Sequence, residues 1–159
     1  MDNLQIGSNI PTMDLESTQG TIQLNQFKDK HIVLYFYPKD NTSGCSQQAQ
    51  DFRDNIDNFA KLETIILGVS RDSLESHEKF IAKFELPFTL ISDPDEKLCK
   101  LFDVIKMKSM YGRQYLGIER STFLIDPQGK LTQEWRKVKV KDHVKTVLKT
   151  IETLTTSCV

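Results

Sequence analysis

The sequence predicts an α/β fold, in which a central mixed β-sheet is flanked by helices and preceded by an N-terminal β-hairpin. Short runs of β-branched and aromatic residues, which favour strands, alternate with segments whose apolar residues recur every three or four positions, as in amphipathic helices. The last two apolar runs are separated only by a Pro-Gln-Gly turn, which is typical of a hairpin. This order of elements predicts helices packed on a mixed sheet.

The first part of the chain predicts a hairpin, a buried strand and a helix. Residues 3–24 carry scattered apolar positions, interrupted by proline and glycine, and fit a short hairpin. Residues 31–37 form a continuous β-branched and aromatic run that Pro38 ends, as expected for a strand buried on both faces. A turn-rich segment, residues 39–44, then leads into a helix. The apolar positions of that helix are Ala49, Phe52, Ile56 and Phe59.

The middle of the chain predicts two more buried strands, at residues 64–70 and 87–92. Between them, Ser73 has the sequence context of a helix N-cap, with acidic residues in the first turn. Asp93 and Pro94 are predicted to cap a short helix. Residues 103–117, which contain two glycines, are predicted to form a loop. The buried positions of the short helix are Leu98, Leu101 and Phe102.

The C-terminal part predicts a hairpin of residues 121–126 and 131–138, followed by a closing helix over about residues 142–154. The 159 residues show no repeat, linker or low-complexity segment. We therefore expect a single domain over residues 1–159, large enough for one sizeable core.

Composition excludes several classes of function. The net charge of −1 gives no clustered positive field, so we expect no nucleic-acid partner. The N-terminal residues lack the basic region and apolar stretch of a signal peptide. No uncharged run approaches the length of a membrane span, so we expect no membrane partner and a cytoplasmic location.

Three cysteines, Cys45, Cys99 and Cys158, are too few and too widely spaced for a disulfide framework. No Cys-x-x-Cys pair is present, and the histidines lie far from the cysteines in sequence, so a zinc site has little support. Free thiols in a reducing compartment are the expected state. Each histidine is predicted to be structural or exposed rather than catalytic, and Trp135 to serve packing. The histidines are His31, His77 and His143.

Cys45 stands at the first turn of a predicted helix, after a buried strand. Unpaired backbone N–H groups at a helix N-terminus favour an anion, and reactive groups of α/β sheets gather at the carboxyl ends of strands. The Thr42 hydroxyl could reach the sulfur and a bound oxygen, Pro38 could shield the sulfur, and Gly44 would let a ligand approach. The same spacing fits a plainer interpretation equally well. Thr42 would then be a helix cap, Pro38 a strand terminator and Cys45 a small buried apolar residue.

A resemblance favours the reactive interpretation. The segment Tyr-Phe-Tyr-Pro-Lys-Asp-Asn-Thr-Ser-Gly-Cys, residues 35–45, resembles the peroxiredoxin active-site segment Pro-x-x-x-Thr/Ser-x-x-Cys. Pro38, Thr42 and Cys45 stand at the motif positions. The flanking residues resemble the bacterioferritin-comigratory (Q-type) group. Further similar segments, which extend the resemblance over nearly the whole chain, are residues 51–54, 90–95, 102–104, 117–126 and 135–140.

The resemblance implies a thioredoxin-like fold and a thiol-dependent peroxidase that reduces hydrogen peroxide and organic hydroperoxides without metal or organic cofactor. In such enzymes the cysteine thiolate becomes a sulfenic acid. Arg120 matches the family's arginine, which stabilises the thiolate and the leaving oxygen. A monomer or weak dimer is expected. A peroxide sensor that does not turn over efficiently remains the alternative, since sensing uses the same activated thiol.

The chain departs from the group at the positions of the resolving cysteine. Gln50 and Ile81 stand where relatives keep that residue, and Ser43 and Gln48 replace a common proline and glutamate. We therefore favour a one-cysteine enzyme reduced by an external thiol such as glutathione, glutaredoxin or thioredoxin. Resolution by another cysteine of the chain remains open. Cys99 has apolar neighbours typical of a core, and Cys158 lies in a C-terminal tail.

Overall fold

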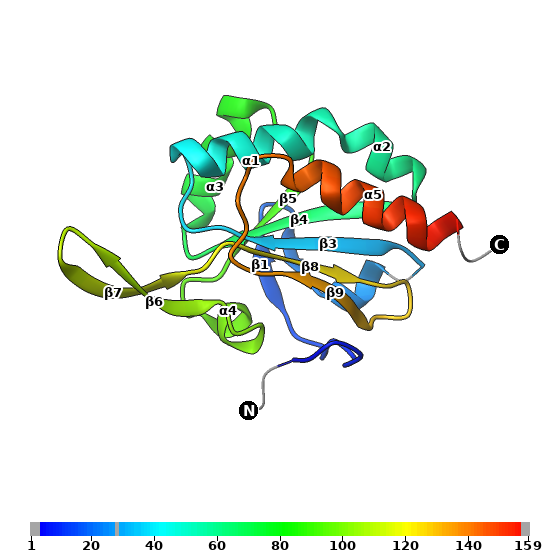
Figure 1. Ribbon diagram of the computed structural model, residues 1–159, viewed down its shortest axis with the longest axis horizontal. Coiled ribbons are helices and arrows are strands. Elements are labelled where there is room, and N and C mark those ends of the chain that lie inside the picture. The colour runs from blue at the N-terminus through cyan, green and yellow to red at the C-terminus, as the bar shows by residue number, and fades with distance from the viewer. Residues whose placement is uncertain (1–3, 28, 157–159) are drawn as a thin grey trace.

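The computed structural model describes residues 4–27 and 29–156 and has a seven-stranded mixed sheet at its centre (Figure 1). The strand order is β2-β1-β5-β4-β3-β8-β9, in which β5, β4 and β3 are parallel and the remaining neighbours are antiparallel. The strands are β1 (Leu15–Ser17), β2 (Gly20–Ile22), β3 (His31–Phe36), β4 (Thr64–Ser70), β5 (Thr89–Ser92), β8 (Ser121–Ile125) and β9 (Leu131–Trp135).

Helices cover both faces of the sheet. In Figure 1, α1, α2, α3 and α5 lie over one face, whereas α4 and the N-terminal segment lie against the other. The helices are α1 (Ser43–Asp54), α2 (Ile56–Lys61), α3 (Leu74–Phe84), α4 (Lys97–Leu101) and α5 (His143–Thr156), with a 3-10 turn at Leu24–Phe27. In the described part of the chain no helix is both long and apolar enough to cross a membrane.

Alternation along β3 divides the core into two clusters. Ile32, Leu34 and Phe36 join the cluster that contains the buried residues of α4. Val33 and Tyr35 point to the opposite face, where they pack with the buried residues of α1, α2, α3 and α5. A buried central strand thus separates two apolar layers, as the uninterrupted apolar run of its sequence predicts.

Most predicted elements are confirmed. The N-terminal hairpin is present as β1 and β2, and Ser73 caps α3 by accepting a hydrogen bond from the backbone of Ser76. The predicted helix after residue 44 is divided, because Asn55 ends α1 and α2 begins at Ile56. Asp93 stabilises the start of α4 through its side chain, which accepts hydrogen bonds from the backbone of Leu98 and Cys99.

The prediction of a loop over residues 103–117 is wrong. This segment forms a two-stranded hairpin of β6 (Ile105–Met110) and β7 (Arg113–Ile118) that projects from the body (Figure 1). Tyr111 and Gly112 both have positive φ, 53° and 78°, as a tight two-residue hairpin turn requires. Only the base of the hairpin packs against the core, through Ile105 and Ile118. The alternation of apolar and polar residues is confined to residues 105–108, so the segment as a whole gives a weak strand signal.

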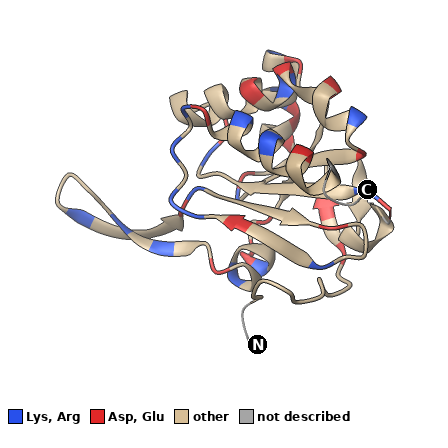
Figure 2. Ribbon diagram, turned by 45° about the vertical axis from the view of Figure 1, so that its right-hand side comes forward, with Lys and Arg blue, Asp and Glu red and all other residues tan. Residues whose placement is uncertain are grey.

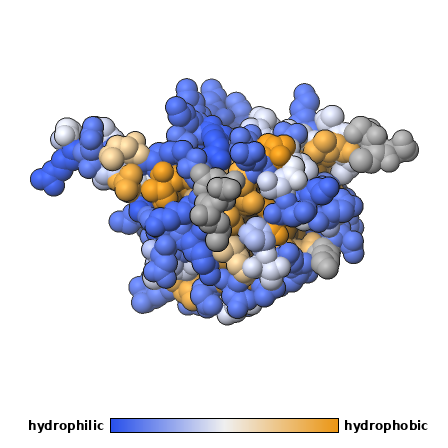
Figure 3. All heavy atoms as spheres, turned by 90° about the horizontal axis from the view of Figure 1, so that it is seen from below, coloured by the Kyte–Doolittle hydropathy of each residue, from blue (hydrophilic) through white to orange (hydrophobic). Residues whose placement is uncertain are grey.

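The hairpin has a distinctive surface. Its charged side chains, Lys106, Lys108 and Arg113, are all basic (Figure 2). Apolar atoms gather where the hairpin joins the body (Figure 3). The exposed large apolar side chains of the hairpin are Met107, Met110, Tyr111, Tyr115 and Leu116.

Candidate active site

The register of the sheet brings Arg120 to the start of α1. β3 and β8 are antiparallel, with Phe36 opposite Ser121. Arg120 immediately precedes β8, so it lies beside the segment that follows β3 and carries Cys45. Residues that are 75 positions apart therefore meet at the carboxyl end of the central strand.

Cys45 is the third residue of α1 and is only 1% exposed. Its sulfur belongs to the apolar cluster that contains Tyr35, Ala49 and Phe52. Nη2 of Arg120 donates a hydrogen bond to the sulfur at 3.3 Å. A guanidinium charge and the N-terminal end of a helix both favour an anionic sulfur at this point.

Gln48 is a further residue of the site, one helical turn after Cys45. Its side chain is fully buried, and its Oε1 accepts a hydrogen bond of 2.6 Å from Nη1 of Arg120. One guanidinium thus holds two groups on the same face of α1. The resemblance marks Gln48 only as a replacement for a common glutamate, although its spacing of three from Cys45 already places both residues on one helical face.

Thr42, Pro38 and Gly44 surround the helix start in different ways. The Thr42 hydroxyl donates to the Lys39 carbonyl at 2.9 Å; it makes no hydrogen bond to the helix backbone as a side-chain cap. Pro38 is half-buried. A Cβ at Gly44 would lie 3.2 Å from Nη2 of Arg120, so glycine leaves room for the guanidinium.

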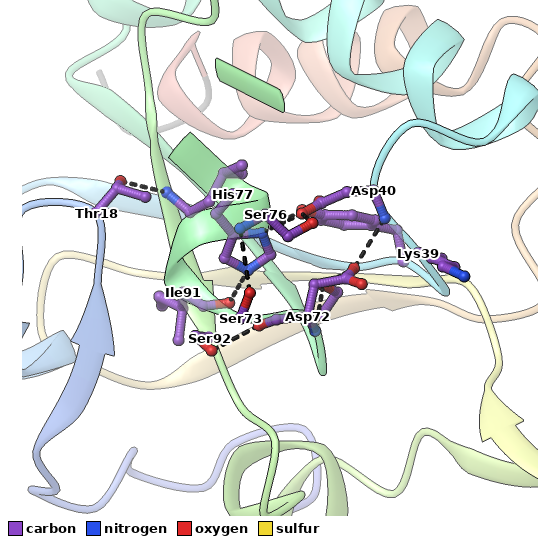
Figure 4. A network of polar contacts seen from close by, with 12 residues as sticks. Thr18, Lys39, Asp40, Asp72, Ser73, Ser76, His77, Ile91 and Ser92 are labelled. Carbon is purple, nitrogen blue, oxygen red and sulfur yellow. Dashed lines mark hydrogen bonds and ion pairs between the residues drawn. The ribbon is translucent and has the colours of Figure 1, made fainter. Parts of the chain in front are cut away.

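A buried polar network lies beneath the loop that leads to Cys45 (Figure 4). Asp40 accepts hydrogen bonds from the hydroxyls of Tyr37 at 2.6 Å and Ser76 at 2.8 Å. His77, with no exposed surface, places Nδ1 2.7 Å from Oδ2 of Asp40. The backbone N–H of Asp40 donates to Asp72 at 2.8 Å. The loop is thereby tied to the ends of β4 and β5 and to the first turns of α3.

The position of one proton follows from this geometry. Nε2 of His77 lies 2.9 Å from the Ile91 carbonyl, which can only accept, so Nε2 carries a hydrogen. If Nδ1 carried no hydrogen, its lone pair would face the Oδ2 lone pairs of an ionised Asp40. The short contact therefore requires a proton between Nδ1 and Oδ2. The pair is therefore either imidazolium with carboxylate or imidazole with carboxylic acid. Burial is the largest cause that raises the pKa of Tyr37, so its phenol stays protonated and donates to Asp40.

Asp40, Asp72 and His77 also bring three potential metal-ligating atoms within 4.8 Å of one another. Hydrogen bonds already use these groups. Ser70 donates to Asp72 at 2.6 Å, in addition to the backbone of Asp40, and both ring nitrogens of His77 are occupied. The arrangement is that of a satisfied polar network.

Cys99 lies apart from this site, as its apolar neighbours predict. It is fully buried and belongs to the core cluster on the face of the sheet opposite Cys45. Burial, and next to it the charge of Asp93, raise the pKa of the Cys99 thiol far above its ordinary range. Cys158 falls outside the described residues.

The other histidines, predicted to be structural or exposed, are buried or half-buried. His143 is buried at the start of α5, and its Nε2 lies 2.8 Å from the Thr122 hydroxyl. Burial is the main cause that lowers its pKa to about 4, and the charge of Arg120 adds to the effect. His31 is half-buried at the start of β3. Trp135 packs against the apolar cluster beside α5.

Comparisons with known proteins agree on one family. Residues 6–134 match the model of the AhpC/TSA family. The chain is 53% identical to Peroxiredoxin Bcp of Bacillus subtilis over 150 residues, which cover 94% of this chain and 96% of the relative. It is 48% identical to Xanthomonas campestris Peroxiredoxin Q, with a TM-score of 0.85 and coverage of 89% and 90%. Xylella fastidiosa PrxQ is 40% identical, with a TM-score of 0.91 and coverage of 98% and 99%.

Two of the similar structures are mutants of Xanthomonas campestris Peroxiredoxin Q, each with serine in place of a different cysteine. The two mutated positions are 36 residues apart in that protein. In this chain the residue at the same separation from Cys45 is Ile81, on α3.

Proposed function

The chain belongs to the AhpC/TSA family and is a thiol peroxidase of the Bcp type with the thioredoxin-like fold of peroxiredoxins, and on this premise we propose that Cys45 is its reacting cysteine. The contact between Arg120 Nη2 and the sulfur, at the first turn of α1, carries the proposal. Pro38 and Thr42, which stand at the motif positions of the family, complete the assigned site.

In the proposed reaction the Cys45 thiolate attacks the terminal oxygen of a hydroperoxide. An S–O bond forms, the O–O bond breaks, and the sulfur becomes a sulfenic acid. The leaving alkoxide or hydroxide takes up a proton and departs as an alcohol or water. Arg120 is placed to stabilise the thiolate beforehand and the negative charge on the leaving oxygen during the step.

Both hydrogen peroxide and organic hydroperoxides are proposed substrates. The bacterioferritin comigratory protein of Xanthomonas campestris, 48% identical to this chain, has alkyl peroxide reduction activity.

We further propose the one-cysteine mechanism. Gln50 and Ile81 are not thiols, and Cys99 belongs to the core cluster across the sheet. An external thiol would attack the sulfenic sulfur, release water and leave a mixed disulfide. A second thiol would then restore the Cys45 thiol and depart as the disulfide. Glutathione, glutaredoxin and thioredoxin are the proposed reductants.

A groove beside the start of α1 supports access by such a thiol. It is lined by Gly44, next to Cys45, and by Val140 on the segment before α5. Its charged lining is mixed, with Lys141 and Lys145 on one segment together with Asp142, and Asp51 and Asp54 on α1.

The test is peroxide consumption with glutathione as reductant. Cys45→Ser should abolish turnover, whereas Cys99→Ser should keep the wild-type rate of the first oxidation. Wild-type turnover by Cys45→Ser would remove Cys45 from the mechanism. Light scattering after size-exclusion chromatography tests the proposed monomer or weak dimer, and cell fractionation tests the proposed cytoplasmic location.

A further inference from the structure

We propose that Gln48 is a positioning residue of the peroxidase reaction. It orients the Arg120 guanidinium against Cys45 and, being neutral, leaves the Cys45 thiolate as the counter-ion of that guanidinium. This inference rests on the proposed role of Cys45 and adds a residue that acts through Arg120.

The geometry gives Gln48 control over the orientation of Arg120. Nη1 and Nη2 belong to one rigid plane, and they bond Gln48 at 2.6 Å and Cys45 at 3.3 Å. Fixing one end of the planar group restricts rotation of the other end. Because Cys45 and Gln48 are neighbours on one face of α1, the helix sets the separation of the two acceptors.

The chemistry of the contact identifies which amide atom faces Arg120. A guanidinium can only donate, so the short contact requires Oε1 of Gln48. Nε2 then points elsewhere and has no hydrogen-bond partner among the described residues, although it is buried. An unpaired buried donor costs free energy, and a methionine at this position would avoid that cost. The benefit of glutamine therefore lies in the acceptor that it presents to Arg120.

The charge around Arg120 is unbalanced without the thiolate. Within the described residues Arg120 forms no ion pair with a carboxylate. The charge of Arg120 lowers the pKa of Lys108 and His143 in addition to burial, and it opposes the rise that burial causes in the pKa of the Tyr35 phenol. A half-buried cation is stabilised by an anionic partner. Since Gln48 is neutral, the sulfur of Cys45 is the contacting group that can supply the negative charge.

Gln48→Glu tests the role of neutrality, because it keeps the shape of the side chain and adds a carboxylate. Arg120 would then pair with the carboxylate, and the thiolate would face an additional negative charge. The midpoint of Cys45 alkylation by iodoacetamide should move to higher pH. Below that midpoint, peroxide oxidation should slow by about tenfold, as expected for a displacement of about one pH unit, and should recover as the pH rises.

Gln47→Glu is the matched control. It adds the same charge at the neighbouring position of α1, where the side chain is exposed, and should leave the midpoint close to that of the wild type. Gln48→Met removes the acceptor without adding charge and should slow oxidation at every pH with little change of midpoint.

A wild-type titration of Gln48→Glu would overturn the counter-ion role, and a wild-type oxidation rate of Gln48→Met would overturn the positioning role. If Gln48→Glu does not fold, as judged by circular dichroism, Gln48→Met decides. These outcomes are distinct from failure of the proposed function, which would appear as full peroxidase activity in Cys45→Ser.

Discussion

Arg120 and Cys45 are 75 positions apart in sequence, and a 3.3 Å hydrogen bond joins them because β8 pairs with β3 so that Ser121 lies opposite Phe36. The sulfur is held by a helix start on one side and by a strand start on the other. The reactive site is therefore a product of sheet register.

Arg120→Met should slow oxidation of Cys45 by hydrogen peroxide on the order of a hundredfold, the usual effect of losing one donor to a developing oxyanion. The pH midpoint of Cys45 alkylation should also rise, because the thiolate loses its cationic partner. Stopped-flow oxidation and iodoacetamide titration measure the two effects. Arg113→Met, which removes an exposed arginine from the tip of the hairpin, is the control and should change neither. An unchanged titration in Arg120→Met would remove Arg120 from the environment of the thiolate.

One equivalent of peroxide should leave Cys45 as a sulfenic acid that a dimedone-type probe captures. A disulfide requires Cα atoms within about 7 Å, and the sheet stands between the core clusters that hold Cys45 and Cys99. Added glutathione should convert the sulfenic acid to a mixed disulfide, seen by mass spectrometry. A non-reducing peptide map with Cys45 joined to Cys99 or Cys158 in high yield would establish a two-cysteine enzyme instead.

His77→Leu should destabilise the fold by about 3–5 kcal/mol, since it leaves the buried Asp40 side chain without its imidazole partner. Urea unfolding followed by circular dichroism measures the loss. Glu75→Gln, which breaks an exposed pair with Lys79 on the same helix, should produce no measurable change. Equal stability of His77→Leu and wild type would mean that the network contributes nothing net.

Stability should fall as the pH drops from about 6.5 towards 4, because of His143. Its pKa is lowered to about 4 in the folded chain, so in this window the unfolded chain binds a proton that the folded chain does not. The loss should reach about 3 kcal/mol and level off below pH 4. Urea unfolding at several pH values checks this, and His143→Gln should flatten the dependence relative to wild type.

Sequence patterns could predict the middle of the sheet because β3, β4 and β8 are buried on both faces. Continuous apolar runs such as residues 64–70 therefore mark strands without ambiguity about the side that faces water. The β6–β7 hairpin gave no such signal. Its side chains at Met107, Lys108 and Leu116 lie beyond the core, which reaches only the base of the hairpin. The Tyr111-Gly112 pair at its turn was the local signal that could have indicated it.

The residues of the candidate site could also be predicted only in part. The position of Cys45 at a helix start could be inferred locally, and the resemblance supplied Arg120. The contact between Asp40 and His77 depends on how α3 docks against the loop after β3, and no spacing in the sequence encodes it. A histidine on an amphipathic helix indicated only a structural role, which is what His77 performs.

The β6–β7 hairpin has a consequence for local opening of the protein. Its interstrand bonds join only its own two strands, and a two-stranded ribbon that packs on the core only at its base is marginally stable. Its backbone amides should therefore exchange with deuterium well before those of β3, and trypsin should cleave first at its basic residues. Ile118 ends the hairpin two residues before Arg120, so fluctuations of the ribbon end beside the guanidinium that holds the sulfur. We therefore expect local opening of the hairpin to reach the segment that carries Arg120.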